Sequence, residues 1–325
     1  LYNFESTNTV AVGTCAGANT TTANTNTYVG HFAAYTNTTG AYNTVMGRSV
    51  FYNNTTGSCN VAIGTDALGQ NTTACSNTAV GNCTLACNTT GCDHVAVGAG
   101  ALDANTTGNE NTAMGRNALG VNTTGNRNTA LGYATLDAST TGCFNTAVGG
   151  LALSTNTTAS SNTAVGYQSL YSNTTGTENT AVGCEALDEN TTACYNTAVG
   201  NLAMACNTTG QSNAAVGYRA LCCNCTTNEN AALGAYALSR QTGFRNVGVG
   251  YGSGCTTSGN CNIFVGWEAG RFVCGACRVL AIGYQALGGG GNKCANNIMA
   301  IGFAALCSNT TGGGNHAIGY QAMQH

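Results

Sequence analysis

Asparagines able to carry a sugar recur along this chain at one place in a repeated segment. Each is followed by Thr or Cys and then by Thr, the acceptor pattern for N-linked glycosylation. On a strand, the Asn and the second Thr share a face, so these residues would form a polar stripe open to glycans. The alternative is an amide ladder, in which stacked Asn side chains bond to one another and to turn backbone. Sugars on the neighbouring Thr hydroxyls are a further alternative. The glycosylation candidates are Asn37, Asn54, Asn71, Asn88, Asn105, Asn122, Asn156, Asn173, Asn190, Asn207, Asn224 and Asn309.

Cysteines recur with the same spacing and offer disulfide chemistry. If 17 residues make one coil, equivalent Cα atoms lie about 4.8 Å apart, within the range that a disulfide allows. We therefore predict cross-coil disulfides, with a row of free thiols packed as small apolar groups as the alternative. A four-thiolate zinc site is disfavoured because such a row is linear rather than tetrahedral, so no metal is predicted. The candidate pairs, each 17 residues apart, are Cys75 and Cys92, Cys206 and Cys223, and Cys277 and Cys294.

Catalytic residues do not assemble in the sequence. The histidines fall in separate repeats, and no nucleophile recurs beside any of them. The densest acidic group is Glu185, Asp188 and Glu189, which a solvated face explains better than acid–base catalysis. No phosphate-binding glycine loop occurs. We therefore predict no catalytic residues, no enzyme activity and no cofactor.

A 17-residue repeat must position all these residues. Glycines from Gly13 to Gly234 follow one another at intervals of 17, and the steps to Gly319 are then 16, 16, 17, 19 and 17. The coils are thus regular over residues 9–245 and irregular over 246–325. No shift in composition marks a second domain, so we predict one domain over 1–325, with about 19 coils.

The repeat is numbered here from its Asn, so that residues 60–76 hold positions 1 to 17 of a reference coil. This length cannot contain two helices, which need about 33 residues, and Asn, Thr, Val and Gly are poor helix formers. We therefore predict an all-β solenoid with two or three short strands per coil, stacked in parallel. Position 4 is aliphatic and position 2 is sometimes Val, so both are expected to face inward with the Leu or Met of position 9. The Gly of position 5 is expected at a sharp turn, either at positive φ or against a neighbouring backbone.

Composition excludes several classes of protein. Only 6% of residues are charged, none is Pro, and the formal net charge is −3. Apolar runs are far shorter than the roughly 20 residues of a membrane span. No basic cluster offers a footprint for nucleic acid.

The repeat resembles a known family. The segments 60–64 and 315–319, Asn-Val-Ala-Ile-Gly and Asn-His-Ala-Ile-Gly, resemble the YadA-like head repeats of trimeric autotransporter adhesins, a left-handed β-roll. The segment 166–176 also resembles repeats of bacterial surface and phage tail-fibre-like proteins. The likeness covers nearly the whole chain, although the adhesin heads have a shorter repeat and few cysteines. It implies an extracellular or cell-surface protein with a structural or adhesive role.

The leading expectation is an extracellular structural fibre or adhesin shaft, glycosylated and self-associating. Leu1 and His325 fall at positions 10 and 11, and an open strand edge can pair with another chain, so end-to-end stacking into a filament is expected beside a lateral oligomer. The alternative is a host- or ligand-binding module like a tail fibre, or an ice-binding face on the Asn/Thr stripe. Adjacent Thr residues at positions 13 and 14 point to opposite faces, which disfavours the ice-binding role.

Overall fold

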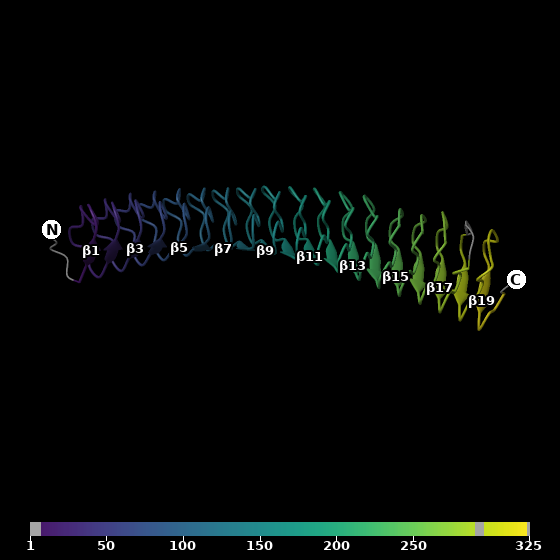
Figure 1. The fold of residues 1–325 in the computed structure, drawn as a ribbon. Helices are drawn as coiled ribbons and strands as arrows, with labels where there is room; N and C mark the ends of the chain where they lie inside the picture. Colours follow the sequence, from purple (N-terminus) through teal and green to yellow (C-terminus); the bar gives the residue numbers. More distant parts are fainter. Residues whose placement is uncertain (1–7, 290–295, 324–325) are drawn as a thin grey trace. The chain divides into compact units, whose positions relative to one another are not determined.

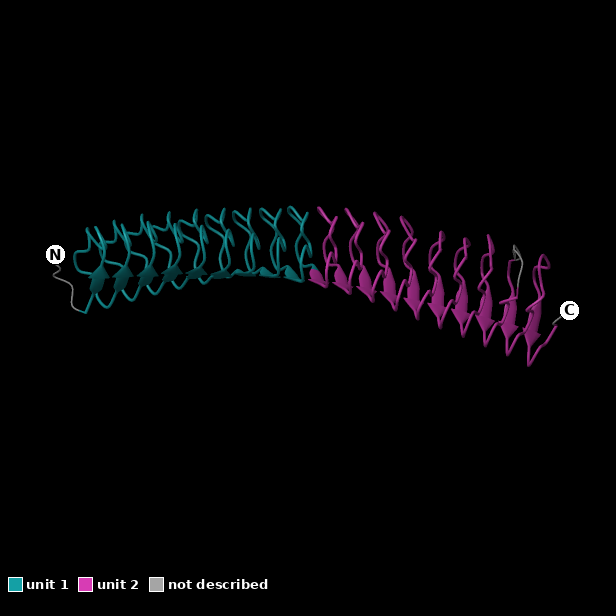
Figure 2. Ribbon diagram, in the orientation of Figure 1, with its two compact units in different colours: residues 1–162 teal, residues 163–325 magenta. Residues whose placement is uncertain are grey.

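Two compact units make up the chain, residues 1–162 and 163–325 (Figure 2), and the computed structural model describes residues 8–289 and 296–323. In each unit the chain winds into stacked coils, with one three-residue strand per coil and turns over the rest (Figure 1). The described residues contain no helix. The prediction of an all-β solenoid is confirmed, but the expected two or three strands per coil are reduced to one.

Strands begin at position 2 of the repeat and end at position 4. Those of unit 1 are β1 (Val10–Val12), β2 (Thr27–Val29), β3 (Thr44–Met46), β4 (Val61–Ile63), β5 (Thr78–Val80), β6 (Val95–Val97), β7 (Thr112–Met114), β8 (Thr129–Leu131) and β9 (Thr146–Val148). Those of unit 2 are β10 (Thr163–Val165), β11 (Thr180–Val182), β12 (Thr197–Val199), β13 (Ala214–Val216), β14 (Ala231–Leu233), β15 (Val247–Val249), β16 (Ile263–Val265), β17 (Leu280–Ile282), β18 (Met299–Ile301) and β19 (His316–Ile318).

Neighbouring strands within each unit pair in parallel with equal repeat positions opposite each other. Ala62 of β4 lies opposite Ala79 of β5, an offset of 17 residues. The same offset holds throughout unit 1 and from β10 to β14 in unit 2. The offset falls to 16 residues from β14 to β16 and rises to 19 between β17 and β18. Each side chain therefore contacts the same repeat position in the coils above and below it.

The interior of the coil is lined by the middle residue of the strand and not by its ends. In the reference coil, Ala62 is fully buried, whereas Val61 and Ile63 are only half-buried. Ala67 and Leu68, at positions 8 and 9, complete the apolar part of the interior. The prediction that positions 2 and 4 face inward is therefore wrong, while that for position 9 is confirmed. The coil is narrow and holds two rows of Asn, at positions 1 and 12, beside Ala and Leu, which leaves the aliphatic side chains of positions 2 and 4 at its outer side.

Large residues at position 3 are matched by small residues at position 9. Phe264 is fully buried in β16, and position 9 is Gly270 in its own coil and Gly254 in the preceding one. A Cβ added to Gly254 would lie 2.5 Å from Cδ2 of Phe264. Tyr28 is likewise buried where position 9 of the preceding coil is Gly17. At these two places the small residue leaves room for the large ring, as close packing requires.

Left-handed backbone conformations close each coil. Glycines at position 5 have φ between 117° and 144°, which confirms their predicted positive φ. Positions 7, 9 and 17 are also left-handed although most of their residues are not Gly, as in Asp66 (φ 57°), Leu68 (φ 50°) and Ser76 (φ 60°). Each such residue costs about 1–2 kcal/mol in isolation. The conformation turns successive N–H groups toward opposite neighbours, since Asp66 donates to Arg48 of the coil before and Leu68 donates to Thr84 of the coil after.

Candidate functional site

The asparagines of position 12 form an internal hydrogen-bonded ladder. Nδ2 of Asn54 donates to Oδ1 of Asn37 at 2.6 Å, and Nδ2 of Asn71 donates to Oδ1 of Asn54 at 2.8 Å. The same nitrogen of Asn54 donates to the carbonyl oxygen of Gly57, at position 15 of its own coil, at 3.1 Å. All the candidates from Asn37 to Asn224 are fully buried, and Asn309 in the last described coil is half-buried. These are the contacts expected of an amide ladder, in which stacked Asn side chains bond to one another and to turn backbone.

This ladder bears directly on the glycosylation candidates. An N-linked glycan is attached to the side-chain amide nitrogen, the atom that here donates to two acceptors and has no access to solvent. Attachment would require the coil to open and would leave buried acceptors without donors. We therefore expect the folded protein to carry no N-linked glycan at the fully buried asparagines from Asn37 to Asn224, and this argument does not extend to the half-buried Asn309.

A second Asn row at position 1 joins each coil to the next. Oδ1 of Asn43 accepts from the backbone N–H of Asn60 at 2.9 Å, and Nδ2 of Asn43 donates to the carbonyl oxygen of Gly57 at 3.0 Å. The carbonyl of Gly57 therefore accepts from both Asn rows, which closes the coil across its interior. The contacts give this row a structural role.

Interruptions of the position 12 row leave buried polar atoms unsatisfied. Ser139 replaces Asn after Asn122, and neither Oγ of Ser139 nor Oδ1 of Asn122 has a hydrogen-bond partner. Gln241 and Thr257 hold the same position and also carry an unsatisfied side-chain oxygen. Buried polar atoms without partners cost about 1–3 kcal/mol each. Asn207 Oδ1 also has no partner although Asn224 follows it in the row, so the loss is not confined to the interruptions.

Thiols at position 16 are hydrogen-bond acceptors and not halves of disulfides. The backbone N–H of Cys75 donates to Sγ of Cys92 at 3.1 Å, and that of Ser58 donates to Sγ of Cys75 at 3.3 Å. Other coils place Ser or Asn oxygens in the same role, as Ser58 does for the N–H of Ala41. Both cysteines are free, so the predicted Cys75–Cys92 disulfide is wrong. Sulfur replaces oxygen here because each can accept the N–H of the coil before.

The remaining disulfide candidates are not bridged either. Cys206, Cys223 and Cys277 are free, and Cys294 lies outside the described residues. Sγ of Cys223 lies 3.3 Å from Sγ of its sequence neighbour Cys222, beyond the S–S bond length of about 2.05 Å. Every cysteine in the described residues is a free thiol, and the described residues contain no group of His, Cys, Asp or Glu arranged to hold a metal ion.

The histidines considered for catalysis that the structure describes lie in separate coils. His31 and His316 are exposed, His94 is fully buried in the position 1 row, and His325 lies outside the described residues. The three acidic side chains do lie near one another. Burial raises the pKa of Asp188, and the charges of Glu185 and Glu189 raise it further. Within the described part of the chain, no helix is long and apolar enough to cross a membrane.

An apolar band runs along unit 2 at positions 4 and 6 of the coils from 246 to 320. Its aromatic side chains remain partly open to solvent, with Trp267 at 48%, Tyr284 at 44% and Phe303 at 43% exposure. Neighbouring rings stack, with centroids 4.3 Å apart for Tyr251 and Trp267, and 5.1 Å apart for Tyr284 and Phe303. The sequence analysis missed this band because it placed position 4 inside the coil. Exposed contiguous apolar surface of this kind marks interaction sites.

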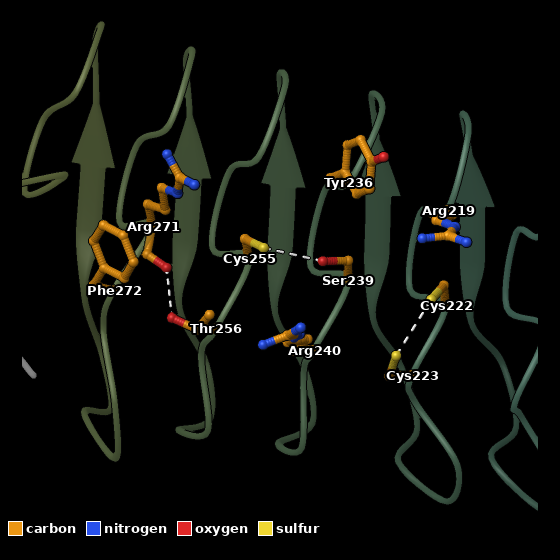
Figure 3. A pocket seen from close by; sticks show the side chains of 10 residues that line it. All are labelled: Arg219, Cys222, Cys223, Tyr236, Ser239, Arg240, Cys255, Thr256, Arg271 and Phe272. Carbon is orange, nitrogen blue, oxygen red and sulfur yellow. Dashed lines mark hydrogen bonds between the residues drawn. The ribbon is translucent and has the colours of Figure 1, made fainter.

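A pocket of about 350 Å³ opens on the turns of unit 2, at positions 7, 10 and 11 of successive coils (Figure 3). Three arginines line it, together with two aromatic rings and the side chains of Ser and Cys residues. The sequence analysis did not find this pocket, because its residues come from different repeat positions. The signal was present as a concentration of arginines in one region: Arg219, Arg240, Arg245, Arg271 and Arg278.

Comparison of the chain with family models and with curated proteins gives no match. The resemblance to adhesin and tail-fibre repeats therefore remains an expectation from the repeated motif.

Proposed function

We propose that this chain is a structural shaft of the fibre or adhesin type, which associates laterally with a second copy of itself. The observation that carries the proposal is the apolar band of unit 2, where Ile282 and Tyr284 stay 36% and 44% exposed. The stacked rings hold the band rigid, so little side-chain entropy is lost when a partner covers it.

Repetition supplies the area that a lateral contact needs. One coil presents roughly 50 Å² of strand face, from a 4.8 Å spacing and three residues of strand. The five coils of the apolar band, β15 to β19, would bury about 500 Å² in total from both partners, so a contact of about 1,000 Å², near the lower bound for a specific interface, needs all ten coils of unit 2. Association along many coils is therefore expected to be cooperative, whereas a few coils would not suffice.

Other parts of the expected function have different support. The extracellular location depends on the family resemblance, because the free thiols remove the disulfide argument for an oxidising compartment. End-to-end stacking stays a prediction. For ice binding, the position 13 hydroxyls are already used, as Thr55 Oγ1 donates to the carbonyl of Thr72 at 3.1 Å, so a measurement of thermal hysteresis is expected to show none.

Sedimentation velocity tests the lateral contact. The wild-type chain is expected to associate with rising concentration, and the double variant Trp267→Asp, Phe303→Asp is expected to stay monomeric with an unchanged circular dichroism spectrum. Thr192→Asp, at an exposed residue outside the band, is the matched control and should associate like the wild type. A wild-type chain that sediments as a monomer at every concentration would contradict the proposal.

A further inference from the structure

The pocket of unit 2 gathers three cationic side chains. Arg219, Arg240 and Arg271 line it. Arg271 pairs with Glu268, whose other oxygen accepts from Nε2 of Gln285 at 3.0 Å. Arg219 and Arg240 have no carboxylate partner within the described residues. Two of the lining arginines are therefore without a carboxylate beside them, and Cζ of Arg219 lies 5.4 Å from the centre of the Tyr218 ring.

The other polar groups of the pocket are neutral and already engaged. Oγ1 of Thr256 donates to the carbonyl oxygen of Arg271 at 2.7 Å, and Ser239 Oγ lies 3.0 Å from Cys255 Sγ (Figure 3). Burial raises the pKa of Cys222 to about 12, so this thiol carries no negative charge at neutral pH. The electrostatic potential inside the pocket is thus set by its arginines.

Aromatic rings form apolar walls beside these charges. Phe272 and Tyr236 both line the pocket, and Cζ of Arg271 lies 5.0 Å from the centre of the Phe272 ring. A ligand that satisfies both features carries an anionic group and also an apolar face that can lie against a ring. A pyranose ring bearing a carboxylate or sulfate has both.

The neighbouring coils limit the length of such a ligand. The same turn positions carry Glu185, Asp188 and Glu189 in the coil two before that of Arg219, and the chain has a net charge of −3. A long polyanion such as nucleic acid would be repelled there. A volume of about 350 Å³ is also at the lower end of small-molecule pockets, which suits a terminal residue.

We propose that this pocket binds the terminal sugar acid of an anionic saccharide, with Arg219 and Arg240 contacting the carboxylate or sulfate, and Phe272 and Tyr236 lying against the sugar ring. This site gives the shaft a ligand-binding function beyond its structural role. It lies on turn positions 7, 10 and 11, beside the apolar band and not on it, since Tyr236 packs edge-on against Tyr251 of the band.

Isothermal titration of the full chain tests the site, with trigalacturonate as the carboxylate probe, a sulfated galactose as the sulfate probe, and neutral galactotriose for comparison. At least one anionic sugar is expected to bind and the neutral sugar is not. The double variant Arg219→Ala, Arg240→Ala should weaken the affinity by about tenfold or more. Arg116→Ala, at an exposed arginine of unit 1, is the matched control and should bind like the wild type.

Three results would overturn the site. They are the absence of binding by both anionic sugars, equal binding of the neutral sugar, and unchanged affinity in a double variant whose melting temperature matches the wild type. Inorganic sulfate and phosphate are titrated as well, and binding of these ions with no anionic sugar bound would also reject a saccharide site.

Discussion

The backbone N–H of Asn111 donates to Nδ1 of His94 at 3.2 Å, one coil away along the position 1 row. Nε2 of the same ring lies 2.7 Å from the carbonyl oxygen of Gly108. An acceptor at Nδ1 and a donor at Nε2 define a neutral imidazole with its proton on Nε2. His94 thus takes over both hydrogen bonds that Asn makes elsewhere in the row, within a fully buried site.

Replacing this histidine is expected to change how stability depends on pH. Burial lowers the pKa of His94 below its usual 6.5, because the charged ring is poorly solvated and would lose its acceptor at Nδ1. The folded state then binds fewer protons than the unfolded state, so the contribution of His94 is complete above pH 6.5 and is lost as the pH falls below it. His94→Asn should remove this loss, up to about 1.4 kcal/mol per pH unit.

Urea unfolding at several values from pH 8 to pH 5 measures this difference. The wild type should lose stability relative to His94→Asn only in the acidic part of the range. His31→Asn, at an exposed histidine, is the matched control and should follow the wild type. Parallel curves for the wild type and His94→Asn would contradict the assignment of a neutral buried ring.

Completing the position 12 ladder should stabilise the protein. Ser139→Asn would supply an Nδ2 donor for the unsatisfied Oδ1 of Asn122, a buried group whose isolation costs about 1–3 kcal/mol. We expect a higher melting temperature by calorimetry. Asn71→Ser makes the opposite change in an intact part of the row and should lower it. Ser154→Asn, outside the ladder, should have little effect, and equal shifts for the Ser139 and Ser154 variants would argue against the ladder.

The glycines of position 5 should not tolerate a side chain. Gly81 has φ 144°, and an added Cβ would lie 2.7 Å from the carbonyl oxygen of Gly98 in the next coil. Gly81→Ala should therefore destabilise by several kcal/mol, by strain and by forcing two coils apart. Gly69→Ala, where the nearest atom would be 3.3 Å away, should be mild. Similar melting temperatures for the two variants would show that the coils are not in this close contact.

Acceptor chemistry, and not sulfur, should matter at position 16. Cys92→Ser keeps an acceptor for the N–H of Cys75 and should lie within about 0.5 kcal/mol of the wild type, whereas Cys92→Ala should lose about 0.5–1.5 kcal/mol. Denaturant unfolding under non-reducing conditions makes the comparison. A large and equal loss in both variants would instead indicate a bond that only sulfur can make.

The sequence predicts much of the fold because repetition exposes it. The spacing from Gly13 to Gly234 gives the coil length, and Gly at position 5 gives a turn of positive φ. The orientation of the strand was missed because Ile63 and its equivalents are more apolar than Ala62, which normally marks the buried face. The coil is too narrow for that rule, and near-invariant Asn was the sign that identical polar neighbours satisfy one another inside.

The pocket and the apolar band could not be predicted in the same way. Arg219, Arg240 and Arg271 occupy three different repeat positions, so comparing the repeats position by position does not bring them together. Their meeting depends on the turn geometry and on the 16-residue steps that follow β14. Departures from the repeat, and not the repeat itself, thus hold the information about binding.

The measurement that tests this account most directly is the distance between two spin labels, carried by unnatural amino acids that replace Thr39 and Thr141 of unit 1. Both replace exposed threonines at position 14, six coils apart. Stacked 17-residue coils predict a narrow distribution centred at about 29 Å. A broad distribution, or a narrow one centred well away from that distance, would show that residues 17 apart are not neighbours in unit 1 and would contradict the stacked coils and the asparagine ladder on which the account depends.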